Sequence, residues 1–233
     1  MKKFAALLLV LAMAAAANAT NPVSLGYSDQ GTTIGSGADA CAGGTLYVNH
    51  DGSFENGYAW RYGGTALPYY GSFGEGYTGL GAGFVCCGAF WLSTLPGMYT
   101  GQLYDAYVWN GAVLPGSVVG MVPGNTPTGV GNWPTVTQHD VAMNIAVTGD
   151  FTIGYWGNWP GGPNGWFCGA DLNGFGGIPW TYIAPGIGYP TGWNDPSIIW
   201  GPTQSMGCGA YFGGNCNVPV ETQSWGSIKA LFE

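Results

Sequence analysis

The sequence has few charged side chains, and basic ones are the scarcest. Its 233 residues include four Lys and Arg against 12 Asp and Glu, which gives a formal net charge of −8. Nucleic-acid binding requires clustered Lys and Arg that displace counterions, and anionic membrane surfaces attract proteins through the same cations. The sequence therefore excludes nucleic acid and anionic membrane surfaces as partners.

Several motifs of catalytic and metal sites are also missing. A serine hydrolase would carry G-x-S-x-G, and a zinc site would carry short CxxC pairs with histidines, but the chain has neither pattern. Its two histidines, His50 and His139, are each followed by an aspartate, Asp51 and Asp140. Neighbours on a strand point to opposite faces, so neither pair is a ready catalytic dyad. The sequence therefore favours a protein that is not an enzyme.

The first 19 residues have the three parts of a secretory signal peptide. Lys2 and Lys3 provide the positive start, residues 4–17 the apolar stretch, and residues 17–19 an Ala-Asn-Ala cleavage site. The apolar run of about 14 residues is too short to cross a bilayer as a helix. We therefore expect residues 20–233 to be secreted or held at the cell surface without membrane insertion. Removal of two lysines and no acid moves the net charge from −8 to −10.

Glycine and aromatic residues are abundant, with 44 Gly, 11 Trp, 14 Tyr and 10 Phe. Apolar and small or polar residues alternate with a period of two in short runs between glycine, proline and asparagine turns, which is typical of antiparallel sandwiches. These runs predict strands at residues 46–50, 58–62, 102–109, 141–147 and 151–155. We predict an all-β fold, an antiparallel two-sheet sandwich of jelly-roll-like form, in a single domain of residues 20–233. Ser224 is expected to cap a short C-terminal helix over residues 225–232.

Residues 51–62 read Asp-Gly-Ser-Phe-Glu-Asn-Gly-Tyr-Ala-Trp-Arg-Tyr. This segment resembles the DG-x-x-EN-G-x-x-W opening of β-sandwich modules in secreted bacterial proteins of uncharacterised function. It is also similar to the G-x-FE-x-G start of jelly-roll carbohydrate-binding modules, and residues 219–232 resemble the endings of the first group. The resemblance implies a secreted bacterial sandwich of jelly-roll type, and it implies no particular activity.

All six cysteines lie after the signal peptide, and an even number in an exported chain predicts up to three disulfides. They are Cys41, Cys86, Cys87, Cys168, Cys208 and Cys216. Cys208 and Cys216 flank a segment of hairpin length, so we predict that they pair. Cys86 and Cys87 point to opposite faces of a strand and are expected to take different partners. The other pairings stay open.

An aromatic cluster in a loop-rich stretch is the leading candidate for a ligand site. Exposed rings stack on the apolar faces of sugars, and amide side chains hydrogen-bond their hydroxyl groups. The candidate ligand-binding residues are Tyr155, Trp156, Trp159, Asn164, Trp166 and Trp193. Because tryptophan is usually largely buried, packing of these rings in the core or at its rim is the favoured alternative.

Two loops carry oxygen ligands of the kind that calcium prefers. Asp171 and Asn173 form one candidate calcium site, and Asp51 with Glu55 forms another. Neither loop continues into a full EF-hand pattern, and Asp-Gly and Asn-Gly are also ordinary turn sequences. We expect no cofactor other than this structural calcium.

Glu55 and Glu75 are the natural pair for a glycoside hydrolase, which needs two facing carboxyl groups. Residues 75–79 resemble an acid/base segment of jelly-roll xylanases, but the companion nucleophile strand is missing. Three functions follow, in order of preference. The first is an exported, non-catalytic structural or binding module whose partners are polysaccharide or other surface proteins. The second is a self-associating assembly protein, and the third is a jelly-roll glycosidase.

Overall fold

The computed structural model describes residues 22–28, 32–34, 41, 43–60, 70–98, 101–157 and 166–216. The predicted signal peptide and the predicted C-terminal helix both lie outside these residues. Within them, no helix is long and apolar enough to cross a membrane.

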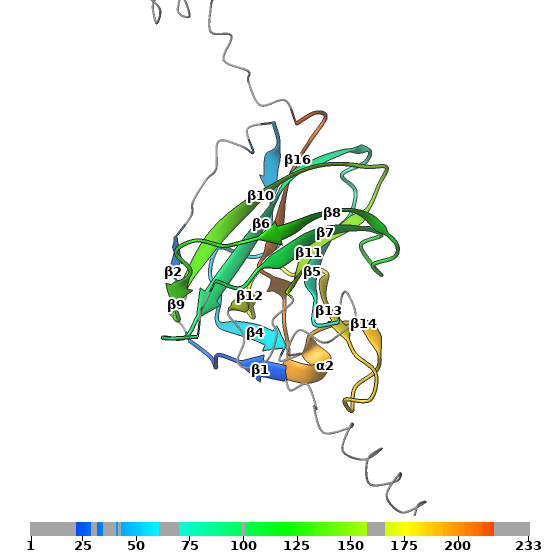
Figure 1. Cartoon of the computed structure of the whole chain (residues 1–233). Coiled ribbons are helices and arrows are strands. Elements are labelled where there is room, and N and C mark those ends of the chain that lie inside the picture. The colour runs from blue at the N-terminus through cyan, green and yellow to red at the C-terminus, as the bar shows by residue number, and fades with distance from the viewer. Residues whose placement is uncertain are drawn as a thin grey trace, which may run out of the picture.

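The described residues form two packed, mainly antiparallel sheets, which confirms the predicted all-β sandwich (Figure 1). The first sheet has ten strands, in the order β1-β4-β12-β6-β10-β2 with β3, β9, β15 and β16 attached beside this path. Its strands are β1 (Pro22–Ser24), β2 (Thr32–Ile34), β3 (Thr45–Tyr47), β4 (Asn56–Trp60), β6 (Gly83–Thr94), β9 (Gly131–Asn132), β10 (Thr135–Val147), β12 (Phe167–Asp171), β15 (Ser205–Met206) and β16 (Cys208–Gly213). Two short pairings, of β10 with β2 and of β6 with β9, are parallel.

The second sheet has six strands in the order β14-β13-β5-β11-β7-β8. They are β5 (Phe73–Tyr77), β7 (Tyr104–Asn110), β8 (Val118–Asn125), β11 (Phe151–Gly157), β13 (Pro179–Ile183) and β14 (Gly192–Asn194). A four-residue helix, α2 (Ser197–Trp200), which the sequence did not predict, lies at the lower end of the molecule beside β1 and β4 in Figure 1. Its Trp200 stacks on Tyr58 of β4 with ring centroids 4.5 Å apart.

The alternation predicted for residues 141–147 is confirmed in β10. Val141, Met143 and Val147 are buried, whereas Ala142, Asn144 and Ala146 are exposed. The register with β6 shifts between Ala142 and Ile145, where Asn144 takes a positive φ of 50°. Asparagine tolerates this left-handed conformation better than most residues, so it suits the bulge in the strand.

Aromatic side chains fill the space between the sheets. The largest fully buried ones come from both layers and include Trp60, Phe73, Phe90, Tyr104 and Trp166. Their edge-to-face contacts, such as Phe90 to Tyr104 at 5.7 Å between centroids, are the geometry that aromatic pairs prefer. Much of the aromatic excess of the sequence therefore serves the core.

Two disulfides join the first sheet to the segments at its edge, and they show that the predicted Cys208–Cys216 pairing is wrong. Cys41 is bonded to Cys87, and Cys86 is bonded to Cys216. The neighbours Cys86 and Cys87 therefore take different partners, as predicted. Residues 208–213 form a strand instead of a loop. At about 3.3 Å per residue, this strand carries the chain far beyond the Cα separation of about 7 Å that a disulfide can bridge.

Candidate functional site

Most of the predicted aromatic platform is buried. Tyr155, Trp156 and Trp166 are exposed by 1%, 7% and 0%, so they cannot present ring faces to a ligand. Tyr155 lies on the core face of β11 with Phe151 and Ile153, as the period-two pattern requires. The ligand-binding prediction is therefore wrong for these three residues, and the packing alternative is confirmed for them. Trp159 and Asn164 lie outside the described residues.

Trp193, the remaining candidate, belongs to a row of rings on the outer face of the second sheet. Consecutive ring centroids in this row are 5.3, 4.9, 4.9 and 5.1 Å apart. The outer aromatic row consists of Tyr70, Tyr182, Trp193, Trp109 and Tyr107. Its first three members are half-buried and its last two are buried. Trp156 lies on this face and donates its indole N–H to the carbonyl oxygen of Tyr70 over 2.8 Å.

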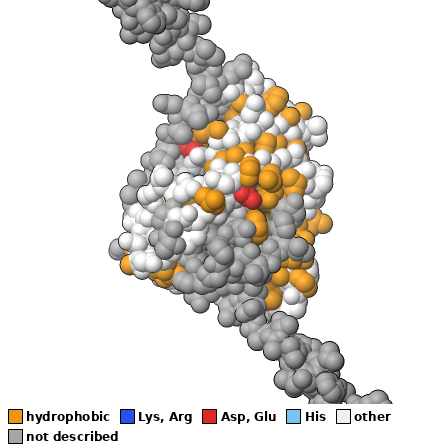
Figure 2. All heavy atoms as spheres, in the orientation of Figure 1, with side chains coloured by type: hydrophobic (Ala, Val, Ile, Leu, Met, Phe, Trp, Pro, Cys, Tyr) orange, Lys and Arg blue, Asp and Glu red, His pale blue; other side chains and the backbone are white. Residues whose placement is uncertain are grey.

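Among the described residues, exposed large apolar side chains gather on the hairpin formed by β7 and β8. Its exposed apolar residues are Val113, Leu114, Val119 and Met121. Figure 2 shows hydrophobic side chains across the side of the molecule where Figure 1 labels β7 and β8, with acidic side chains only as small patches. Residues 104–125 contain a single charged residue, Asp105. We call residues 104–125 the β7–β8 hairpin and take it as the candidate functional surface.

The exposure of this hairpin follows from its local structure. On β8, Gly120 faces the Ile145 side chain of β10 and Val122 packs against the core, so Met121 between them points outward. Val119 is exposed at the point where the register with β7 shifts. The alternating pattern of residues 102–109 predicted β7 and its turn, but it did not predict this surface. The available signal was an Ala-Val-Leu run between Asn-Gly and Pro-Gly turns, where polar residues are usual.

No family model, curated protein or solved structure matches the chain.

Glu75 is a fully buried carboxyl group on the core face of β5, between Phe73 and Tyr77. Its Oε1 accepts hydrogen bonds from the Asn49 side chain and the Ile178 backbone, each 2.7 Å long. Its Oε2 accepts one from the Met206 backbone over 2.8 Å. Because Met206 belongs to the first sheet and Glu75 to the second, this carboxyl group ties the two layers together.

Burial raises the pKa of Glu75 to about 8, against the opposing effect of its three N–H donors. Glu55 is also buried. Its Oε2 accepts a hydrogen bond from the Leu172 backbone, and its Oε1 lies 2.9 Å from the Ser53 hydroxyl. A glycosidase needs carboxyl groups that reach the glycosidic bond and a water or the anomeric carbon. Glu55 and Glu75 are instead buried and hydrogen-bonded to the protein, so these contacts do not support the glycosidase hypothesis.

The predicted calcium ligands act as turn-forming groups. Asp171 Oδ1 accepts the backbone N–H groups of Asn173 and Gly174, and its Oδ2 accepts that of Asp51. Asp51 Oδ1 accepts both donors of Ser53, and the Ser53 hydroxyl is the main cause of the lowered pKa of Asp51. Among the described residues, no group of three His, Cys, Asp or Glu side chains is placed to hold a metal ion. Calcium binding stays a prediction.

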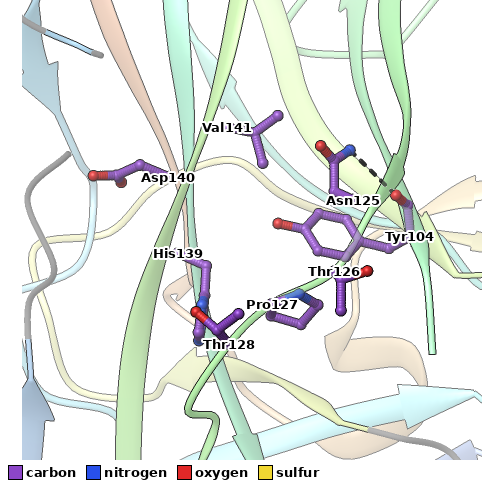
Figure 3. A pocket seen from close by; sticks show the side chains of 8 residues that line it. All are labelled: Tyr104, Asn125, Thr126, Pro127, Thr128, His139, Asp140 and Val141. Carbon is purple, nitrogen blue, oxygen red and sulfur yellow. Dashed lines mark hydrogen bonds between the residues drawn. The ribbon is translucent and has the colours of Figure 1, made fainter. Parts of the chain in front are cut away.

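The two histidines serve the fold separately. His50 Nδ1 accepts the Gly52 N–H over 3.1 Å, and its ring packs on Trp91. His139 Nε2 lies 2.8 Å from the Thr137 hydroxyl. Burial lowers the pKa of both histidines to about 4. Figure 3 shows His139 and Asp140 pointing away from each other at an open hollow of about 200 Å³, which agrees with the expectation that they form no dyad.

Proposed function

We propose that this protein is an exported, non-catalytic structural component that assembles with copies of itself through the β7–β8 hairpin. The single observation that carries the proposal is the gathering of four exposed apolar side chains on one nearly uncharged hairpin at the edge of a sheet. Export is supported by the signal-like residues 1–19 and by the two disulfides, which are typical of oxidising compartments.

The position of β8 favours a second copy of the chain as the partner. β8 is the last strand of its sheet, and no other described strand pairs with its outer edge. Natural edge strands are protected by charges, by proline or by bulges. β8 contains no charged residue, and its Pro123 and two register shifts with β7 leave residues 120–122 as the regular stretch between them. A two-fold arrangement would place β8 against β8 of a second copy in antiparallel fashion, because isologous interfaces use the same patch on both subunits.

Charge complementarity also fits a second copy. Asp105 is the only charged residue of the hairpin, so two copies meet with little like-charge repulsion at this surface. An oppositely charged partner would find almost no charge to recognise there. Val119 and Met121 would instead lose exposed apolar surface on contact, which stabilises association by about 25 cal/mol per Å².

We expect the protein to associate as its concentration rises, and Met121→Lys to raise the dissociation constant at least about ten-fold. The added ammonium group would have to leave water at the interface, and lysine on an edge strand opposes pairing. Sedimentation velocity over a wide concentration range measures the change.

The matched control is Ile198→Lys on α2. Ile198 and Met121 are both 46% exposed, so the two variants add the same charge at equal exposure in different places. Ile198→Lys should associate like the wild type. A wild type that stays monomeric throughout the range would overturn the proposal, and so would equal weakening by both variants.

Glycan binding is the second candidate function, supported by the half-buried rings of Tyr70, Tyr182 and Trp193 in the outer aromatic row. Partly exposed, mutually packed rings form a preorganised stacking surface. If this function is correct, Trp193→Ala should weaken binding to its glycan at least about ten-fold, and Trp193→Phe should retain part of the affinity. Glycan-array screening followed by calorimetry tests it, and a folded wild type that binds no glycan would rule it out.

A further inference from the structure

Cys168 and Cys208 are a pair of thiols inside the main core. Both side chains are fully buried, and their Sγ atoms lie 3.9 Å apart. They are the cysteines of the described chain that form neither of the two disulfides. Two buried sulfur atoms at this separation call for an explanation beyond chance packing.

The strand register explains why the two residues meet. Ala170 of β12 is opposite Met206 of β15, and the Gly207 N–H donates to the Gly169 carbonyl over 2.8 Å. Beyond Gly207 the chain leaves β12. Cys168 pairs with Leu92 of β6, and Cys208 pairs with Phe90 of the same strand. Leu92 and Phe90 are two residues apart and both are in the core, so the side chains of Cys168 and Cys208 lie next to each other on the core face.

Besides the other sulfur atom, Cys168 has only weak polar contacts, including one to the Gly207 carbonyl oxygen 4.0 Å away. The described residues contain no group of three side chains that could hold a metal ion. Burial raises the pKa of the Cys208 thiol well above its ordinary value, which disfavours the reactive thiolate in the folded state. A catalytic or metal-binding role therefore has no support, whereas a structural bond fits the site.

We propose that Cys168 and Cys208 are joined by a third disulfide in the exported protein. The sulfur atoms would approach by about 2 Å to reach the usual bond length. The bond would link β12 to β16 covalently, near the point where β12 stops pairing with β6 and begins to pair with β15. It is independent of the self-association proposed above, because both residues are remote from solvent.

The step is an ordinary thiol–disulfide exchange. The two thiols lose two protons and two electrons, an S–S bond forms between Cys168 and Cys208, and an external disulfide R–S–S–R is cleaved to two R–SH. The oxidant is a small-molecule or protein disulfide of the oxidising compartment. Because both thiols have no exposed surface in the folded chain, the exchange belongs to folding, before the core closes.

Thiol counting on the exported full chain tests the proposal. The protein is purified without reductant, unfolded in guanidinium chloride and treated with iodoacetamide. We expect no alkylated cysteine, an intact mass that rises by six hydrogens on reduction, and a proteolytic fragment that links the peptides of Cys168 and Cys208. The Cys168→Ala/Cys208→Ala double variant is the control, and its mass should rise by four hydrogens.

Two alkylated thiols per chain at Cys168 and Cys208, with a mass increase of four hydrogens in the wild type, would overturn the proposal. A fragment linking Cys208 to any other cysteine would overturn it as well. Both readouts use the wild-type chain, so they remain decisive even if the double variant fails to fold.

Discussion

Glu75→Ala is expected to lower the free energy of unfolding by about 4 kcal/mol. The substitution leaves the N–H groups of Asn49, Ile178 and Met206 without their acceptor, and it opens a cavity where the two sheets are tied together. Each unsatisfied buried donor costs about 1–3 kcal/mol. Urea denaturation followed by tryptophan fluorescence measures the loss, and a change below about 1 kcal/mol would contradict the assigned role.

Glu75 should also make the free energy of unfolding decrease as the pH rises toward 8. Its folded pKa of about 8 lies above the ordinary value of 4.5, so the folded chain holds a proton that the unfolded chain releases. The Glu75 titration should therefore lower the stability by about 1.6 kcal/mol as the pH rises from 6.5 to 8. His50 and His139 oppose part of this fall. Their ordinary pKa of 6.5 leaves the unfolded rings half protonated at pH 6.5, whereas a folded pKa of about 4 keeps the folded rings neutral. Each histidine adds about 0.4 kcal/mol over the window, so the net fall should be about 1 kcal/mol.

Glu75→Gln separates this titration from the hydrogen bonds. The amide oxygen can still accept from Asn49 and Ile178, but the amide N–H₂ faces the Met206 N–H, which costs about 2 kcal/mol. The decline between pH 6.5 and 8 should disappear in this variant. Glu55→Gln, which makes the same substitution at another buried glutamate, should keep it. A decline that persists in Glu75→Gln would assign the titration to a different group.

Gly154→Ala is expected to cost about 3 kcal/mol, because there is no room for a side chain between β5 and β11. Gly154 is directly opposite Gly74, and an added Cβ would collide with the Phe73 carbonyl oxygen and lie 2.7 Å from the Gly74 Cα. Both are backbone atoms, so the strands themselves would have to separate. The midpoint of urea denaturation reports the loss.

Gly149→Ala provides the matched control in the turn that precedes the same strand. An added Cβ there meets no atom within 4 Å, and Gly149 is not among the glycines with a positive φ. We expect its stability to stay within about 0.5 kcal/mol of the wild type. Equal effects of the two substitutions would show that the close approach of β5 and β11 is not what requires glycine at position 154.

The sequence allowed the fold class and several strands to be predicted, because period-two alternation directly reports which face of a strand is buried. In β10 it separated Val141 and Met143 from Ala142 and Asn144 correctly. The same rule, applied to β11, already places Tyr155 with the core residues Phe151 and Ile153. Tyr155 was nevertheless predicted to bind a ligand, because a glycine-rich loop with further aromatic residues follows the strand.

The remaining errors concern contacts between residues far apart in the chain. The Cys86–Cys216 bond closes a separation of 130 residues, which no local pattern specifies. Burial of Trp156 depends on Tyr70, 86 positions earlier. The three donors around Glu75 come from three different segments, so the sequence identified the residue but could not show that its carboxyl group is enclosed.

The attachment of Cys41 and Cys216 to adjacent residues of β6 has a mechanical consequence. A pulling force applied to the chain before Cys41 and after Cys216 would pass from Cys41 to Cys87, across one peptide unit to Cys86, and on to Cys216. The strands between these cysteines would carry none of that tension. β1 and β2 precede Cys41 and would be pulled from β4 and β10, whereas the strands from β3 to β16 would stay folded under the same force.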